Sequence, residues 1–152
     1  MKSLKVALAG VLACALLAFT NVSMEKVPQK VKNAFAQKFP HAKSVKWDRE
    51  SPNEWEAAFK LDRMEYSANF TDDGTWKETE HEIEESQVPS NVRKSLRDNF
   101  KGYTINESEI SETQQGMVYE IEIKKDGSEM EVALDASGKV INKEELDKED
   151  KD

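Results

Sequence analysis

The chain has 152 residues, with 30 acidic residues against 22 lysines and arginines and a formal net charge of −8. An acidic chain without a basic stripe is unsuited to nucleic acid or to an anionic membrane surface, so we expect neither as a partner. The single cysteine, Cys14, lies in the N-terminal leader. The remainder can form no disulfide, and its fold must depend on an apolar core.

The first 24 residues have the pattern of a secretory signal peptide. Lys2 and Lys5 precede an apolar run over residues 6–19, which is too short for a permanent membrane span. We therefore expect a periplasmic or secreted protein without a membrane span once residues 1–24 are removed. Residues 11–14 also approach the motif that precedes a lipidated cysteine, so anchoring through Cys14 is the less favoured alternative.

Residues 28–39 and 89–100 are each predicted to form an amphipathic helix. Pro28 and Pro89 stand in the first turn, where a missing N–H costs nothing. Pro40 ends the first helix, and Gly102 is the expected stop after the second. Apolar residues recur at helical spacing in both segments. They are Val27, Val31, Ala34, Phe35 and Phe39 in the first, and Val88, Val92, Leu96 and Phe100 in the second.

Four strands are expected after each helix. Residues 54–61 and 64–71 alternate apolar and polar side chains, as do residues 117–124 and 130–134, which is typical of half-buried antiparallel strands. A change of parity between Ile105 and Ile110 predicts a bulge. Fourth strands are expected to start at Trp76 and Val140. The predicted turns are centred on Asp62-Arg63, Asp73-Gly74, Asp126-Gly127 and Ser137-Gly138.

This succession of elements occurs twice, with a period of about 60 residues. Val27-Pro28 returns as Val88-Pro89, and Trp55 returns as Tyr119. The expected fold is α+β: two tandem α-β4 repeats, residues 25–86 and 87–145, with the helices packed on one face of an antiparallel sheet. One copy alone would be marginally stable, so a shared core is expected. The charge-rich segment from residue 144 onward, including the tail 146–152, is expected to be disordered.

The first copy resembles the PepSY-like, β-lactamase-inhibitor-like family of exported proteins, found mainly in Bacteroidetes-type bacteria. The resemblance covers nearly all of residues 25–145. The second copy departs from the motif, because Lys101 replaces Pro40 and no tryptophan matches Trp47. The matching residues are Val27-Pro28, Val31, Phe35, Phe39-Pro40, Ala42, Val45, Trp47, Trp55, Phe59, Phe70, Asp73-Gly74 and Trp76.

The resemblance implies the architecture of a tandem inhibitor that grips a β-lactamase with its open sheet face. The family has no established activity and supplies no catalytic residues. The residue pattern of this chain suggests no catalytic residues either. His41 and His81 are too few for a zinc site, and Asp72-Asp73-Gly74 lacks the alternating carboxylates of a calcium loop. We therefore expect no metal, no cofactor and no enzymatic activity, with a carboxylate-based hydrolase as the weaker alternative.

The polar face of the sheet is the expected binding surface, suited to a basic envelope or extracellular protein or peptide. If the repeats join edge to edge, this face forms one broad acidic surface. A small-ligand or cation-binding envelope accessory protein remains an alternative. The candidate residues are Glu54, Glu56, Lys60, Glu120, Glu122 and Lys124, with Glu65, Ser67, Asn69, Glu129 and Glu131 expected on the same solvent-exposed face. Trp47 and Trp76, near strand ends, are the other candidate anchors for a partner.

Overall fold

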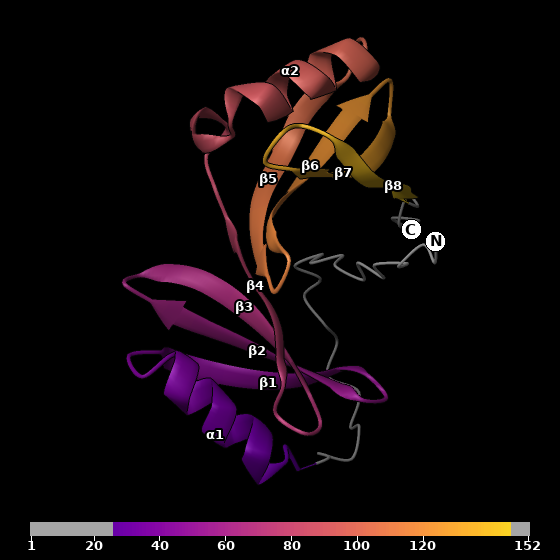
Figure 1. Cartoon of the computed structure of the whole chain (residues 1–152). Coiled ribbons are helices and arrows are strands. Elements are labelled where there is room, and N and C mark those ends of the chain that lie inside the picture. The colour runs from indigo at the N-terminus through magenta and orange to yellow at the C-terminus, as the bar shows by residue number, and fades with distance from the viewer. Residues whose placement is uncertain (1–25, 147–152) are drawn as a thin grey trace.

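The computed structural model describes residues 26–146, which form two helices and one eight-stranded antiparallel sheet (Figure 1). The predicted signal peptide and Cys14 lie outside the described residues. Each strand pairs with the next in the chain, so the sheet order is β1 to β8 without a crossover. The strands are β1 (Lys43–Ser51), β2 (Glu54–Leu61), β3 (Met64–Thr71), β4 (Trp76–Glu82), β5 (Thr104–Thr113), β6 (Gly116–Lys125), β7 (Ser128–Asp135) and β8 (Val140–Leu146).

Both predicted helices are present. The first is α1 (Gln29–Lys38), and the second is α2 (Ser90–Asn99), preceded by a short 3-10 turn, η1 (Glu85–Gln87). Pro28 and Pro89 hold the N-cap positions. A phenylalanine caps the C-terminus of each helix. Its backbone N–H donates to a carbonyl one turn back, from Phe39 to Phe35 and from Phe100 to Leu96.

The tight turns follow the sequence prediction. Asp62 and Arg63 have φ values of 49° and 73°, and Asp126 and Gly127 have 50° and 80°. Positive φ at both central residues is the requirement of a type I′ hairpin. The bulge predicted in the fifth strand is also present, as a register shift between Ile105 and Glu107 in its pairing with β6.

Gly74 and Gly138 recur at equivalent places because a hairpin there presses on a helix. Both have positive φ, 88° and 86°. A Cβ on Gly74 would stand 2.9 Å from the carbonyl oxygen of Lys30, and one on Gly138 would stand 2.5 Å from that of Asn91. The β3–β4 and β7–β8 hairpins therefore pack against the backbones of α1 and α2, and only glycine allows this approach.

Each helix covers its own core, and this corrects the expectation of a shared one. Phe35 of α1 packs edge-on against Phe59, with ring centroids 5.1 Å apart. The first core consists of Val31, Phe35, Trp55, Ala57, Phe59, Ala68 and Phe70. The second consists of Val88, Val92, Leu96, Ile121, Ile123, Val132 and Leu134. The predicted alternation of core and outward-facing residues is confirmed, since the core residues occupy every second position within β2 and likewise within β6.

The final strand corrects one expectation about the tail. Glu144 and Leu146 lie in β8, opposite Glu131 and Glu129 of β7, so residues 144–146 are ordered. Hydrogen bonding along β7 stabilises this segment despite its charge. Residues 147–152 lie outside the described part, and the domain boundaries at 24, 86 and 145 stay predictions.

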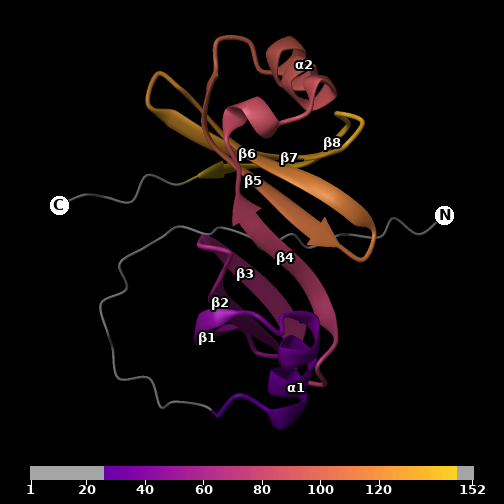
Figure 2. The same cartoon turned by 90° about the vertical axis from the view of Figure 1, so that its left-hand side faces the viewer.

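The helices lie on the outer sides of the molecule, and the sheet bends between them (Figures 1 and 2). The junction is the pairing of β4 with β5, which places Glu80 opposite Ser111 and His81 opposite Ile110. As a result, the two repeats turn the faces without helices inward, toward each other. Within residues 26–146, no helix has the length and apolar character needed to cross a membrane.

Candidate functional site

The sheet surface opposite α1 and α2, hereafter the helix-free face, collects glutamates from strands β2 to β8. Since side chains alternate along a strand, the residues between core positions in β2 and β6 point to this face. Strand pairing then sets Glu109 opposite Glu120, and Glu131 between Glu122 and Glu144. We call its more buried members the acidic cluster: Glu56, Glu78, Glu80, Glu109, Glu120 and Glu131.

The centre of the acidic cluster is removed from water. Glu80 is 6% exposed and Glu120 is 3% exposed. Three small polar neighbours on the same face are also buried: Ser67, Asn69 and Ser111. A carboxylate in such surroundings loses hydration, and no cation compensates for the loss.

Burial and mutual repulsion raise the pKa values of these carboxyls. Burial is the first cause for Glu120, followed by the nearby charge of Glu80, and together they raise its pKa to about 9. The pKa of Glu80 rises to about 8, through burial and then through Glu78. Burial also raises the pKa of Glu109 and that of Glu131 to about 7. Part of the cluster therefore carries protons at neutral pH.

The hydrogen bonds that neighbouring side chains donate to the acidic cluster are long. The hydroxyl of Ser67 donates to Glu80 at 3.3 Å, and the amide of Asn69 donates to Glu78 at 3.4 Å. Oδ1 of Asn69 and Oε1 of Glu120 are buried and have no hydrogen-bond partner. Oδ1 of Asn69 is always an acceptor, and Oε1 of Glu120 is an acceptor once Glu120 has lost its proton, so the ionised face lacks donors.

No basic side chain among the described residues forms an ion pair with the acidic cluster. The ion pairs within residues 26–146 join Lys38 to Glu112, Arg49 to Asp72, Lys60 to Glu65 and Lys94 to Asp98. On the helix-free face itself, Lys60 lies 2.9 Å from Glu65, and Lys124 donates to the side chain of Asn106 at 2.5 Å. The negative charge at the centre of this face therefore has no counterion from these residues.

The structure places the sequence candidates in two separate groups. Glu56 and Glu120 belong to the acidic cluster, and Glu122 adjoins it opposite Glu131. Glu54 lies at the start of β2, while Lys60 and Lys124 are exposed near the ends of β2 and β6. The prediction that Ser67, Asn69 and Glu120 are solvent-exposed is wrong, because all three are buried, with at most 6% of their surface exposed.

The two candidate tryptophans lie on the helix side of the sheet. Trp47 packs edge-on against Phe35 with centroids 5.3 Å apart. Trp76 lies under the ammonium group of Lys38, 3.7 Å from its ring centroid, and its Nε1 donates to Thr79 at 2.9 Å. Both rings are half-buried beside the first core. They are therefore separated by the sheet from the acidic cluster.

Sequence reasoning missed Glu78, Glu80 and Glu109. These residues lie in β4 and β5, which form the junction between the repeats. The signal was present, because residues 78, 80 and 82 are all glutamates at strand spacing. It was not used because the apolar alternation that identified the other strands is weak in β4.

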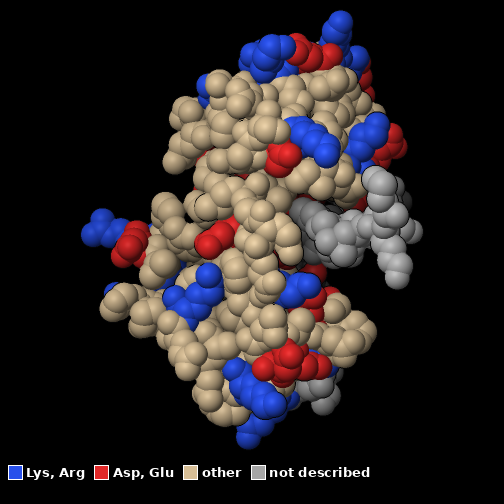
Figure 3. Space-filling view, in the orientation of Figure 1, with Lys and Arg blue, Asp and Glu red and all other residues tan. Residues whose placement is uncertain are grey.

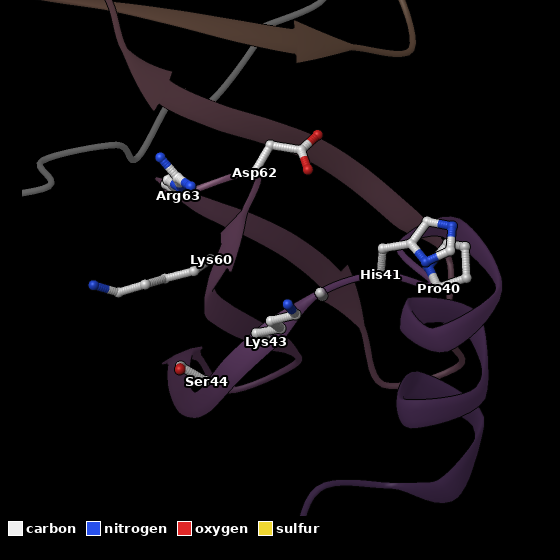
Figure 4. Close-up of a pocket in the computed structure, with 8 residues that line it drawn as sticks. Pro40, His41, Lys43, Ser44, Lys60, Asp62 and Arg63 are labelled. Atoms are coloured by element: carbon white, nitrogen blue, oxygen red, sulfur yellow. The ribbon is translucent and has the colours of Figure 1, made fainter.

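A second feature is a pocket of about 810 Å³ at the end of the first repeat. His41, Lys43, Lys60, Asp62 and Arg63 are among the residues that line it. In Figure 4 the charged ends of the two lysines and the arginine point in different directions and do not meet on one point. Of the predicted site residues, this pocket contains only Lys60.

The residues considered for metal binding have other roles in the structure. His81 lies against the ring of Tyr66, with centroids 4.7 Å apart, whereas His41 lines the pocket. Asp73 accepts hydrogen bonds from the Thr71 hydroxyl at 2.5 Å and from the Thr75 backbone at 3.0 Å, which lowers its pKa to about 2. Within the described part of the chain, no three histidine, aspartate or glutamate side chains are arranged to hold a metal ion.

Comparison with known proteins supplies a family and a fold. The family model described as “Putative beta-lactamase-inhibitor-like, PepSY-like” matches residues 17–66 and 53–142. The chain is similar in structure to a BLIP-like protein from Bacteroides fragilis, with 16% identity and a TM-score of 0.71 over 86% of this chain and 94% of that one. No curated protein matches the chain significantly.

Two further solved structures have the same fold. One is a DUF2874 family protein from Bacteroides uniformis, with 14% identity and a TM-score of 0.72 over 79% of this chain and 90% of that one. The other, from Bacteroides eggerthii, is described among “putative periplasmic proteins” and has 16% identity and a TM-score of 0.71 over 80% and 91% of the two chains. At such identities the likeness concerns the fold alone.

Proposed function

From the membership of this chain in the PepSY-like, β-lactamase-inhibitor-like family, we propose that it is an exported, non-enzymatic binding protein. It docks a basic partner protein of the cell envelope or extracellular medium on its helix-free face. The description of the similar Bacteroides eggerthii protein as periplasmic supports this location.

The observation that carries the proposal is a buried acidic cluster without a basic partner. Glu80 and Glu120 are almost fully buried, and no ion pair among the described residues involves them. The unpartnered oxygen of Asn69, and that of Glu120 once it is ionised, require donors. Arginine and lysine side chains carry positive charge and supply donors only, so they fit this face in both respects.

The hydrolase alternative has one observation in its favour, since a carboxyl with a raised pKa suits a general acid. Glycoside hydrolysis also needs a second carboxylate that remains ionised as base or nucleophile. All six carboxyls of the acidic cluster have raised pKa values. Each of these carboxyls is shifted toward its protonated form, so none of the six is favoured as the ionised base or nucleophile, and binding is the better supported function.

The test is a binding measurement on the chain expressed with its own leader and purified after export. Octa-arginine serves as the probe, and octa-glutamate serves as the negative control. The double variant Glu80→Gln with Glu120→Gln replaces two central carboxyls, which can ionise against a bound guanidinium, by amides, which cannot. Because charge-assisted hydrogen bonds contribute about 1.5–3 kcal/mol each, its affinity for octa-arginine should fall at least about tenfold.

A matched variant controls for overall charge. Glu112→Gln with Glu145→Gln removes the same number of carboxyls from exposed positions that lie outside the acidic cluster. It should bind octa-arginine within about twofold of the wild type, because strand register places both side chains on the helix side of the sheet, away from the acidic cluster. Equal losses in the two double variants, or no binding by the wild type, would contradict the proposal.

A further inference from the structure

We propose that docking on the helix-free face is coupled to proton release: the free protein holds protons on the central glutamates, and arginine side chains of the partner displace them. This inference rests on the proposed function and specifies how the same face is regulated. Docking would then be strong in neutral to alkaline surroundings and weak in acidic ones.

The strand register is the geometric basis. Glu109 stands between Glu82 on β4 and Glu120 on β6. Residues directly opposite each other on paired strands have Cβ atoms about 4.5–5.5 Å apart. A second row runs across four strands, in the order Glu107, Glu122, Glu131, Glu144. Carboxylates in such adjacent positions repel one another, so ionising all of them together is unfavourable.

Charged groups from every neighbouring strand add to this repulsion, while α1 and α2 lie on the opposite side of the sheet. Among the basic groups on these strands, Lys77 partly offsets the raised pKa of Glu78, and Lys124 donates to the side chain of Asn106. The carboxyls that act on Glu120 are Glu80 and Glu78 from β4, Glu109 from β5 and Glu131 from β7. Glu82 stands opposite Glu109, and Glu107, Glu122 and Glu144 belong to the second row.

Burial makes the repulsion effective at physiological pH. The pKa values of Glu120 and Glu80, about 9 and about 8, are raised first by burial and then by neighbouring carboxylates. At neutral pH the cluster is therefore partly protonated in the free protein. Oε1 of Glu120 still lacks a hydrogen-bond partner, as does Oδ1 of Asn69 at the other end of the cluster.

An arginine side chain changes this balance. Its guanidinium donates five N–H groups and accepts none, so it binds ionised carboxylates more strongly than protonated ones. Each carboxyl that loses its proton releases it to solvent and gains a charge-assisted hydrogen bond from the guanidinium. The bound state then has lower pKa values than the free state, and proton release occurs at pH values between the two.

The affinity for a basic partner should rise with pH. Because binding lowers the pKa values, the affinity rises with pH over the range in which the free cluster still holds protons. Each proton released corresponds to about a tenfold gain in affinity per pH unit. Between about pH 6 and pH 8, one released proton would therefore strengthen binding about 100-fold.

The experiment is calorimetry of octa-arginine binding to the exported protein in two buffers of different ionisation enthalpy, at about pH 6, 7 and 8. The expected result is an apparent enthalpy that depends on the buffer with the sign of proton release, together with affinity that rises with pH. Glu120→Gln should release fewer protons and show a shallower rise, whereas Glu145→Gln should behave as the wild type.

The outcomes separate the two proposals. Binding that is lost in the double variant but is independent of buffer and pH would overturn proton coupling and leave the proposed function intact. Absence of binding at every pH would overturn both. Proton uptake, or affinity that falls as pH rises, would also overturn the coupling.

Discussion

Replacing Trp55 by alanine is expected to lower the free energy of unfolding by about 3–5 kcal/mol. Trp55 is 3% exposed and belongs to the first core. Its ring lies 4.6 Å from the guanidinium of Arg49, and its Nε1 donates to Asp72 at 2.7 Å. Alanine would leave a cavity, and it would also remove the donor that connects β2 to the end of β3.

Urea denaturation of the exported protein measures this loss. Trp55→Phe keeps an aromatic ring and removes the Nε1 donor, so a smaller cost of about 1 kcal/mol is expected. Tyr119, the equivalent residue of the second repeat, is half-buried, and Tyr119→Ala should cost less, about 3 kcal/mol. An unchanged denaturation midpoint for Trp55→Ala would show that this ring does not lie in the core.

The free energy of unfolding is expected to fall by several kcal/mol between about pH 5.5 and pH 9, because each unit by which folding raises a pKa contributes about 1.4 kcal/mol. Folding raises the pKa of Glu80 to about 8 and that of Glu120 to about 9, from a usual value of 4.5. Raised pKa values in the folded state favour folding at low pH. The stabilisation is complete below the unfolded pKa and is lost as pH rises through the folded values.

A single substitution tests the origin of this pH dependence. Glu120→Gln keeps the size of the side chain and removes its charge, so it should stabilise the protein at about pH 9 and flatten the dependence of stability on pH. Glu145→Gln should leave the slope unchanged, since Glu145 is exposed on the outer strand. Thermal denaturation across the pH range measures both variants. Stability independent of pH, or loss of stability in Glu120→Gln at about pH 9, would contradict the account.

The fold was predictable because its determinants are local. The spacing of apolar residues identified both helices, and alternation around Trp55 and Ile121 identified the core faces of the strands. Turn residues were equally informative: Asp126-Gly127 adopts the positive φ values that its hairpin requires. The exception was the relation between the copies, which have separate cores joined through β4 and β5.

The candidate site was only partly predictable because it depends on the bend of the whole sheet. Sequence parity placed Glu56 and Glu120 on the helix-free face correctly. It could not show that Glu120 is buried or that Glu80 lies close enough to raise its pKa. These properties arise from the pairing of two strands in different repeats. Sequence parity also did not show on which face of the sheet the Trp47 ring lies, since its orientation depends on contact with α1.

The most direct test of the central claim is nuclear magnetic resonance mapping of octa-arginine on the isotope-labelled exported protein at about pH 8. Chemical-shift changes should concentrate in β4, β5 and β6 around Glu80, Ser111 and Glu120, and at the side-chain amide of Asn69. The changes should be absent in the double variant Glu80→Gln with Glu120→Gln. Shifts concentrated on α1, α2 or the pocket around Lys43, or spread evenly over the surface, would contradict the central claim.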